Sequence, residues 1–181
     1  DSTVVHRDGR ENFARIVRRL PRETTLRRTA DDADPVERVI VANADQLAVV
    51  VASTNPQPRT GLIDRALIAA FDAGITPLLI VTKTDLAPAT ELTALYEPLG
   101  LPVVQVANKE VTTHIRGLFA GHRTVLIGHS GVGKSTLVNA LVPDAERTTG
   151  GVNEVTGKGR HTSTSVVALP FTDHGLIIDT P

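Results

Sequence analysis

The chain has 181 residues, a mass of 19.2 kDa and a formal net charge of −1. This is enough for one sizeable core or for a domain with part of a second, so a large multidomain machine is excluded. Hydrophobic residues make up 41% and charged residues 22%, as in soluble globular proteins, and no apolar run approaches the roughly 18 residues that a membrane-spanning helix needs. Cysteine is absent, which excludes disulfides, thiolate catalysis and thiolate zinc sites within these residues.

The N-terminal end of the sequence indicates where the protein is found and whether the chain is a fragment. It carries no basic segment followed by an apolar one, so we expect a cytoplasmic protein rather than a secreted or membrane-anchored one. Because the first residue is Asp1 and not Met, we expect a fragment of a longer chain.

The first forty residues show no helical periodicity and predict a small β module. Short apolar runs at Thr3–Val5 and Ala14–Val17 are separated by charged turns. The basic segment Arg18–Arg22 is expected to be extended, because Pro21 disfavours helix in the residue before it. The acidic stretch Ala30–Pro35 has the composition of a loop or linker.

From Arg38 onward, short apolar strands alternate with amphipathic helices, a pattern typical of an α/β fold with a mainly parallel sheet. Strands are predicted at Val39–Ala42, Leu47–Ala52, Leu78–Val81, Val103–Val106, Thr124–Ile127 and Leu176–Ile178, with Val166–Leu169 as an antiparallel companion. Helices are predicted at Gly61–Ala73, Ala89–Leu99, Val111–Leu118 and Lys134–Leu141.

The strongest motif, Gly128–Ser135, matches the phosphate-loop pattern G-x-x-x-x-G-K-[ST] in every constrained position. It follows a predicted strand and opens a predicted helix. Glycines let successive backbone N–H groups point at phosphate oxygens, and the helix N-terminus adds a favourable dipole. Lys134 is expected to reach the β and γ phosphates, and the Ser135 hydroxyl to bind Mg²⁺. The predicted nucleotide contacts here are Gly128, His129, Ser130, Gly131, Val132, Gly133, Lys134, Ser135 and Thr136.

A second motif, Asp179-Thr180-Pro181, ends the predicted strand Leu176–Ile178. An acidic residue at this place is expected beside the phosphate-loop Mg²⁺, which it holds through water. Asp-Thr-Pro is also the beginning of the Asp-x-x-Gly motif of GTPases. A plain strand that ends in a turn is the alternative.

A third motif, Thr82-Lys83-Thr84-Asp85, follows another predicted strand. GTPases place Asn-Lys-x-Asp there, because the carboxylate accepts hydrogen bonds from guanine N1–H and the 2-amino group while the Lys stem lies along the base. Adenine offers no such pair of donors. Thr82 replaces the Asn, so one supporting bond is expected to be shortened or lost. A polar turn with Asp85 as a helix cap is the alternative.

The order of these motifs differs from that of an ordinary GTPase, in which the phosphate loop comes first and the base motif last. Here Asp85 precedes Lys134 by 49 residues, and 47 residues follow Lys134. Either the base motif is accidental, or the sheet is circularly permuted, with spatial neighbours kept and chain ends moved. Strands keep their places under such a change, because chain termini commonly lie near each other at the surface.

With these motifs the chain resembles the circularly permuted, ribosome-small-subunit-dependent GTPases of the RsgA or YjeQ family. The resemblance covers most of residues 36–181. It is carried by Ala42–Leu47, Thr82–Leu86, Gly128–Thr136, Gly157–Thr164 and Asp179–Pro181. The departures are Thr82 for Asn, a poor match of Ala107-Asn108-Lys109 to the second guanine loop, a shortened OB segment and no zinc domain.

The resemblance implies GTP hydrolysis coupled to late maturation of the small ribosomal subunit. The ligands are then GTP, GDP and Mg²⁺, and the partners are the small subunit and its rRNA; we expect a monomer. It also implies an N-terminal OB-fold and a C-terminal zinc domain, so zinc is expected only in a domain absent from this chain. Ala107 and Asn108 join Thr82, Lys83 and Asp85 as expected base contacts. The N-terminal arginines suit an RNA-facing OB surface, and a solvated charged face is the alternative. They are Arg15, Arg18, Arg19, Arg22, Arg27 and Arg28.

Residues 148–164 resemble the first switch loop of GTPases, with an ordinary surface loop as the alternative. Thr162 or Thr164 is expected to supply the hydroxyl that meets Mg²⁺ when a γ-phosphate is present. The resemblance implies an apolar residue in place of the usual water-orienting glutamine, so turnover without a partner should be slow. His161 is the candidate for orienting water and His129 its competitor. Contact with RNA or solvent is the alternative role for His161.

The sequence therefore predicts a partial OB-fold-like β module with a linker, residues 1–35, and a circularly permuted phosphate-loop GTPase domain of α/β class, residues 36–181. The predicted catalytic residues are Lys134, His161, Thr162 and Thr164, and the predicted Mg²⁺ ligands are Ser135, Thr162, Thr164 and Asp179. A phosphate-loop ATPase or kinase, which leaves the base motif accidental, and an RNA-binding module with a vestigial nucleotide site are the alternatives.

Overall fold

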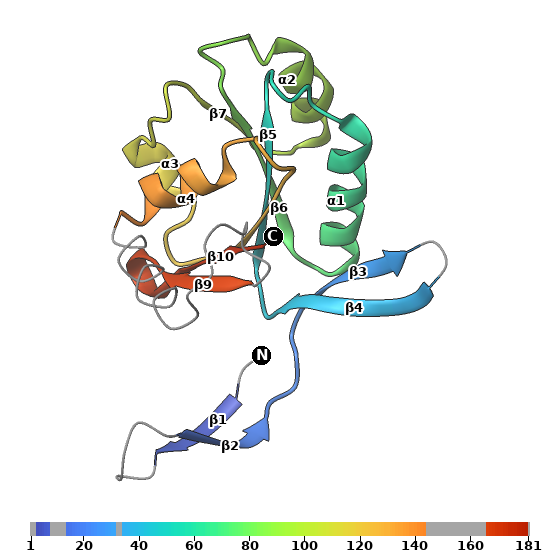
Figure 1. The fold of residues 1–181 in the computed structure, drawn as a ribbon, viewed down its shortest axis with the longest axis vertical. Coiled ribbons are helices and arrows are strands. Elements are labelled where there is room, and N and C mark those ends of the chain that lie inside the picture. The colour runs from blue at the N-terminus through green and yellow to red at the C-terminus, as the bar shows by residue number, and fades with distance from the viewer. Residues whose placement is uncertain (1–2, 8–13, 32–33, 144–165, 181) are drawn as a thin grey trace, which may run out of the picture.

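The structure is a computed structural model, and it describes residues 3–7, 14–31, 34–143 and 166–180. Its main body is a six-stranded sheet with helices on both faces, and two antiparallel hairpins from the N-terminal segment extend below it in Figure 1. Among the described helices, none is long and apolar enough to cross a membrane.

The sheet has the strand order β7-β6-β5-β8-β10-β9. All described strand pairs in it are parallel except that of β9 with β10 at one edge. Each strand lies within two residues of its predicted position, because a strand buried on both faces is a short apolar run between turns. The bounds are β5 Gln46–Ala52, β6 Thr76–Thr82, β7 Val103–Val106, β8 Arg123–Ile127, β9 Val167–Pro170 and β10 Leu176–Asp179.

Helices cover the two faces in pairs (Figure 1): α1 (Thr60–Asp72) and α2 (Thr90–Tyr96) on one, α3 (Thr113–Gly117) and α4 (Lys134–Leu141) on the other. Side chains alternate along a strand, and β5 serves both cores for this reason. Leu47, Val49 and Val51 lie in the core that includes α1 and α2, and Ala48, Val50 and Ala52 lie in the core that includes α3 and α4.

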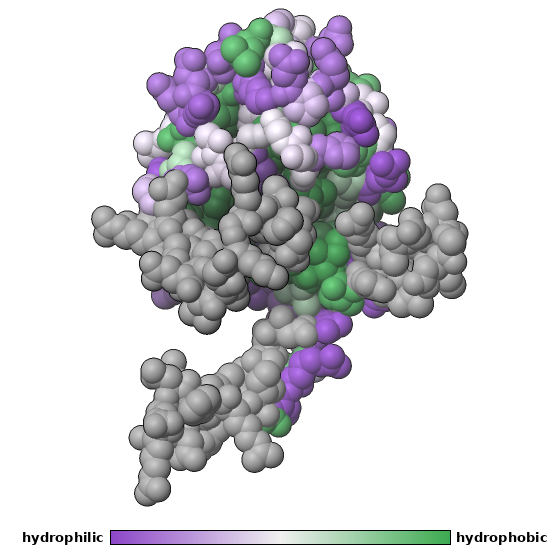
Figure 2. Space-filling model, in the orientation of Figure 1, coloured by the Kyte–Doolittle hydropathy of each residue, from purple (hydrophilic) through white to green (hydrophobic). Residues whose placement is uncertain are grey.

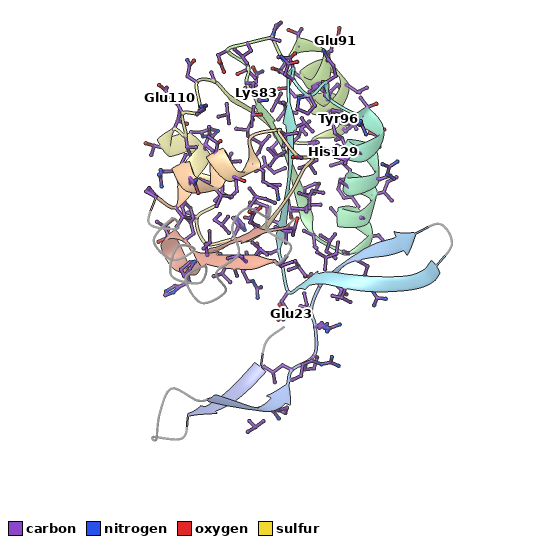
Figure 3. All side chains as sticks on the ribbon, in the orientation of Figure 1. Glu23, Lys83, Glu91, Tyr96, Glu110 and His129 are labelled. Carbon is purple, nitrogen blue, oxygen red and sulfur yellow. The ribbon has the colours of Figure 1, made fainter. Side chains whose placement is uncertain are left out.

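The second helix is shorter than predicted, since α2 ends at Tyr96 and a 3₁₀ helix, η1, continues over Glu97–Leu99. Pro98 has no backbone N–H and cannot extend the α-helical bonding. Tyr96, labelled in Figure 3, lies on α2. Its hydroxyl donates to Asp64 Oδ1 at 2.8 Å and joins α2 to α1. Burial, together with this bond, raises the pKa of the Tyr96 phenol. A second 3₁₀ helix, η2, spans Thr172–His174.

The N-terminal segment forms two hairpins, β1 (Thr3–Arg7) with β2 (Ala14–Arg19) and β3 (Thr25–Asp31) with β4 (Asp34–Ala42). The first pair confirms the two predicted strands. The strand expected at Val39–Ala42 exists, but as the end of β4; its assignment to the parallel sheet is wrong, and β3 was not predicted. The stretch Ala30–Pro35 contains the adjacent ends of β3 and β4 rather than a linker, with 32–33 outside the described residues. The division at residues 35 and 36 stays a prediction.

The hairpins are joined to the body at the amino ends of β5 and β8. Glu23 N donates to Asn43 Oδ1 at 2.8 Å, and the Thr24 hydroxyl donates to the Ala44 carbonyl at 2.5 Å. Asp45, the next residue, accepts from the backbone N–H of Arg123 at 3.0 Å. Figure 2 shows a hydrophilic surface between the β1–β2 hairpin and the body. Arg18 and Arg19 at the end of β2 and Arg22 after it are exposed.

Candidate nucleotide-binding site

The predicted motifs meet at one edge of the sheet, outside the carboxyl ends of its parallel strands. The phosphate loop follows β8, the base motif Thr82–Asp85 begins at the end of β6, and Asp179 is the last residue of β10. Open α/β sheets bind ligands in the crevice at this edge. The topology therefore brings together motifs that lie far apart in the sequence.

The phosphate loop, residues 128–133, is fixed by backbone geometry that glycine allows. A Cβ atom on Gly128 would lie 2.4 Å from the Val50 carbonyl oxygen. Gly131 and Gly133 have φ of 81° and 93°, in the left-handed region that side chains disfavour. The chain turns at Gly133 directly into α4, whose first residue is Lys134. The strand, loop and helix thus follow one another as the motif predicts.

Lys134 and Asp179 form an ion pair across the site, with Nζ 2.8 Å from Oδ1. Their side chains are only 12% and 20% exposed. The ammonium also donates to the Thr180 carbonyl, and the Thr180 hydroxyl donates to the Leu126 carbonyl of β8 at 2.8 Å. These contacts hold the charged end of Lys134 between β8 and β10.

The acidic side of the site fits a divalent cation. Oδ1 of Asp179 is buried, and among the described residues it faces only the Lys134 ammonium, so it keeps lone pairs for a cation or its water shell. Ser135 is the second residue of α4 and places a hydroxyl at the same end of the helix. A carboxylate and a hydroxyl are oxygen ligands of the kind that Mg²⁺ takes beside nucleotide phosphates. Ser135 and Asp179 are therefore the described residues that could hold Mg²⁺.

A cavity of about 410 Å³ lies between the loop after β6 and the start of α4. Asp85 Oδ1 accepts the backbone N–H of Asn108 at 2.9 Å, so the base motif and the loop after β7 are joined at this cavity. Ala107 does not line it; its carbonyl accepts the Glu110 N–H at 2.9 Å in the turn. The lining consists of Thr82, Lys83, Asp85, Leu86, Val106, Asn108, Lys109, Val111, Gly133, Thr136 and Leu137.

The base motif is also bonded to the phosphate loop. The hydroxyl of Thr82, a buried residue, lies 2.5 Å from the Val132 carbonyl oxygen and 3.2 Å from that of Val51. The Lys83 ammonium donates to the Gly131 carbonyl at 2.8 Å and to the Asn55 carbonyl. The hydroxyl of Thr82 therefore keeps a bond to the phosphate loop, although the sequence led us to expect a shortened or lost one.

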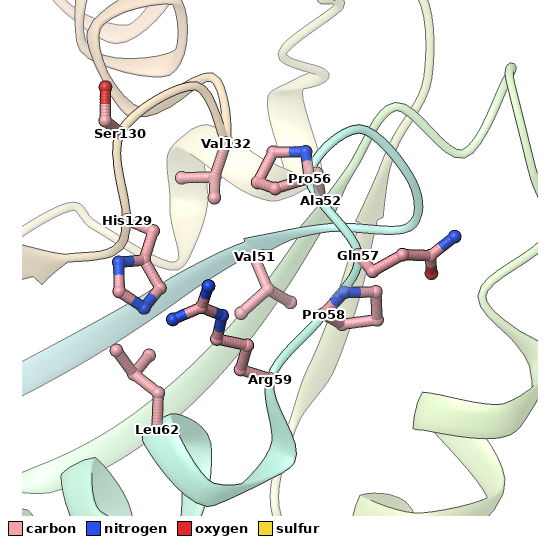
Figure 4. Close-up of a pocket in the computed structure, with 10 residues that line it drawn as sticks. All are labelled: Val51, Ala52, Pro56, Gln57, Pro58, Arg59, Leu62, His129, Ser130 and Val132. Atoms are coloured by element: carbon pink, nitrogen blue, oxygen red, sulfur yellow. The ribbon is translucent and has the colours of Figure 1, made fainter.

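His129 and Ser130 lie away from the base cavity. Both line a separate cavity beside the start of α1, where the His129 ring points toward Arg59 and Leu62 (Figure 4). This orientation does not favour His129 as the residue that orients water. His161, Thr162 and Thr164, the other predicted catalytic residues, lie outside the described residues.

Sequence reasoning missed several contributors to this site. The carbonyls of Asn55 and Thr180 accept bonds from the two site lysines, and Leu86, Val111 and Leu137 line the base cavity. Backbone acceptors leave no signal in a sequence. The apolar residues did have one, because they flank the motifs, but a core role explains them equally well.

Comparison with known proteins gives one matching family model and a group of similar proteins. A family model described as RsgA GTPase matches residues 19–181. The chain is 40% identical over 186 residues to the small ribosomal subunit biogenesis GTPase RsgA of Pseudomonas aeruginosa strain LESB58. This match covers 98% of this chain and 54% of that protein. The chain is also 41% identical over 186 residues to the protein of the same name from Pseudomonas syringae pv. syringae strain B728a, covering 98% and 53%. The chain thus spans about half the length of these relatives.

Two solved structures share the fold. The crystal structure of YjeQ from Thermotoga maritima matches with a TM-score of 0.67 and 27% identity, over 93% of this chain and 55% of that one. YloQ, described as a circularly permuted GTPase, matches with a TM-score of 0.65 and 26% identity, over 99% and 55%. The predicted fold class, a circularly permuted α/β domain preceded by a β module, is confirmed.

Proposed function

Because the chain belongs to the RsgA GTPase family, we propose that it binds GTP and GDP and hydrolyses the β–γ phosphoanhydride of GTP during late maturation of the small ribosomal subunit. The observation that carries this proposal is the bonding of the base motif to the phosphate loop. Thr82 and Lys83 each contact a phosphate-loop carbonyl, and Asp85 lines the same cavity as Gly133 and Thr136. A base and its phosphates can therefore be bound together there.

Asp85 favours guanine over adenine as the base. A carboxylate offers about four lone-pair positions, and the Asn108 N–H occupies one of them at Oδ1. That bond fixes the direction of the carboxylate and leaves acceptors for guanine N1–H and the 2-amino group. We assign the Lys83 stem, Thr82, Asn108 and Ala107 to the surroundings of the base.

Catalysis in this proposal consists of positioning and charge stabilisation. Backbone N–H groups from Gly131 to Lys134 donate hydrogen bonds to the phosphate oxygens. The Lys134 ammonium leaves Asp179 and binds the β and γ phosphates instead. Ser135, a switch threonine and, through water, Asp179 would hold Mg²⁺, which neutralises charge on the phosphate oxygens when it is bound.

The attacking water needs a polar group to orient it, and we assign this role to His161. Thr162 or Thr164 supplies the hydroxyl that meets Mg²⁺ in the GTP-bound state. All three belong to the segment that resembles a switch loop. Binding of the small subunit is proposed to raise the hydrolysis rate by placing this segment over the γ-phosphate.

The proposed partners are the small ribosomal subunit and its rRNA, in the cytoplasm, with the chain acting as a monomer. Exposed arginines on β2, on β3 and on the segment between these strands support an RNA contact, since Arg pairs well with phosphate. These are Arg18, Arg19, Arg22 and Arg27. The division into a partial OB-fold-like module, residues 1–35, and a GTPase domain, residues 36–181, and a zinc site in a further C-terminal domain are part of the same proposal.

Phosphate release tests the proposal. The chain is incubated with GTP or ATP, with Mg²⁺, with and without purified small subunits, and Lys134→Ala serves as the control for contaminating activity. We expect hydrolysis of GTP and not of ATP, faster with small subunits. Equal hydrolysis of ATP would favour a general phosphate-loop ATPase, and RNA binding without any nucleotide binding would favour the vestigial site.

A further inference from the structure

A second cavity, of about 170 Å³, borders the phosphate loop without sharing any lining residue with the base cavity. It lies between residues 129–132, the end of β5 and the start of α1. Since a molecule of liquid water takes about 30 Å³, the cavity holds five to six waters or roughly one long side chain. The nucleotide contacts proposed above for the phosphate loop use backbone N–H groups, so the side chains of His129, Ser130 and Val132 remain available to this cavity.

The chemistry of the cavity is divided between an apolar floor and a basic rim. Val51, Leu62 and Val132 supply aliphatic surface, and the Arg59 guanidinium and the His129 imidazole converge above it (Figure 4). Both polar groups donate hydrogen bonds. The arrangement suits a ligand that has an aliphatic stem and a carboxylate at its end.

The basic rim lacks a neutralising partner in the described part of the chain. No ion pair or hydrogen bond of the Arg59 side chain or of the His129 ring to another described residue is present. Arg59 is the N-cap residue of α1 with no side-chain capping bond, and the first turn of α1 holds no acidic residue. The helix dipole at this end therefore adds to the positive charge.

We propose that this cavity is a docking site for one glutamate side chain of a protein partner. The carboxylate lies between Arg59 and His129, and the methylene groups lie on Val51 and Leu62. The apolar floor argues against a free phosphate ion, which needs hydrogen-bond donors on all sides. Glutamate is preferred over aspartate because its longer stem covers more of the floor. The site does not depend on whether the chain hydrolyses GTP.

The test is a titration followed by ¹H–¹⁵N NMR of the whole chain, saturated with GDP and Mg²⁺. The probes are acetyl-Ala-Glu-Ala-amide and acetyl-Ala-Gln-Ala-amide, which differ only in the charge of the central side chain. We expect saturable shifts of the Leu62 and Val132 amide signals, and a dissociation constant about three- to fivefold lower for the glutamate peptide, as for a partly exposed ion pair.

Two variants locate the charge. Arg59→Gln should abolish the preference for glutamate, because Gln keeps a polar side chain but not the cation. Arg65→Gln is the matched control, since Arg65 is also exposed on α1 but does not line the cavity, and it should keep the preference. Loss of the preference in both variants would indicate general charge attraction and would overturn the proposal.

Three further outcomes would overturn it. The first is the absence of saturable shifts at Leu62 and Val132. The second is equal affinity for the two peptides, which would indicate an apolar pocket that does not recognise a carboxylate. The third is tighter binding of inorganic phosphate than of the glutamate peptide, followed by the same amide signals, which would indicate a general oxyanion site.

Discussion

The phosphate loop is held in different ways on its two sides. Toward β6, Thr82 and Lys83 are bonded to carbonyl groups of the loop, and none of these atoms is needed by a phosphate. Toward β10, the contacts come from Lys134, the residue after the loop, which pairs with Asp179 and donates to the Thr180 carbonyl. The proposed ligands need both Lys134 and Asp179. The base side is therefore organised before binding, whereas the phosphate side has to exchange partners.

The largest effect is expected at the side that exchanges partners. Lys134→Ala removes a charge-assisted contact with phosphate that contributes about 1.5–3 kcal/mol, so GDP and GTP affinity should fall about 10- to 150-fold. Titration with a fluorescent GDP analogue measures this. Lys134→Arg keeps the charge, and its nucleotide affinity should lie between those of the parent and of Lys134→Ala, because a guanidinium does not fully replace a compact ammonium. Unchanged affinity in a folded Lys134→Ala chain would contradict the site.

Asp179→Asn separates the two roles of the carboxylate. The variant should lose about tenfold in GDP affinity when Mg²⁺ is present, because a charged ligand of the cation's water shell is gone. In EDTA its affinity should equal or exceed that of the parent, since Lys134 no longer has to leave Asp179. Asp173→Asn, in the exposed turn before β10, is the control and should keep the parental dependence on Mg²⁺. The same dependence in Asp179→Asn would sink the interpretation.

A smaller effect is expected on the organised side. Thr82→Val keeps the shape of the side chain but leaves the Val132 carbonyl without its bond, which costs about 1 kcal/mol, or roughly fivefold in GDP affinity if the loop shifts. Thr82→Ser keeps the hydroxyl and should bind like the parent. If Val and Ser variants bind GDP equally well, the hydroxyl does not hold the loop.

The sequence predicted the elements whose residues carry their own signal. β5 is buried along its whole length and, from Leu47 onward, is an unbroken apolar run. The phosphate loop follows from glycines at fixed spacing. β3 was missed because its residues, TLRRTAD, are mostly polar and show no clean alternation. The end of α2 was predictable from Pro98, yet the apolar Leu99 favoured a longer helix.

The side-chain contacts of the site depend on strand order, which the sequence shows only indirectly. The pair of Lys134 and Asp179 requires β10 to lie beside β8, and the bond from Thr82 to Val132 requires the loop after β8 to reach the end of β6. Arg59 and His129 are 70 residues apart in the sequence and meet only because α1 begins beside the phosphate loop.

Guanine recognition by Asp85 is tested by comparing GTP with XTP binding in the parent chain and in Asp85→Asn. The exchange turns one acceptor oxygen into a donor, which suits the 2-oxo group of xanthine and opposes the 2-amino group of guanine. GTP affinity should fall about tenfold or more in Asp85→Asn, and XTP should become the better ligand. A variant that prefers GTP over XTP as strongly as the parent does would show that Asp85 does not read the base.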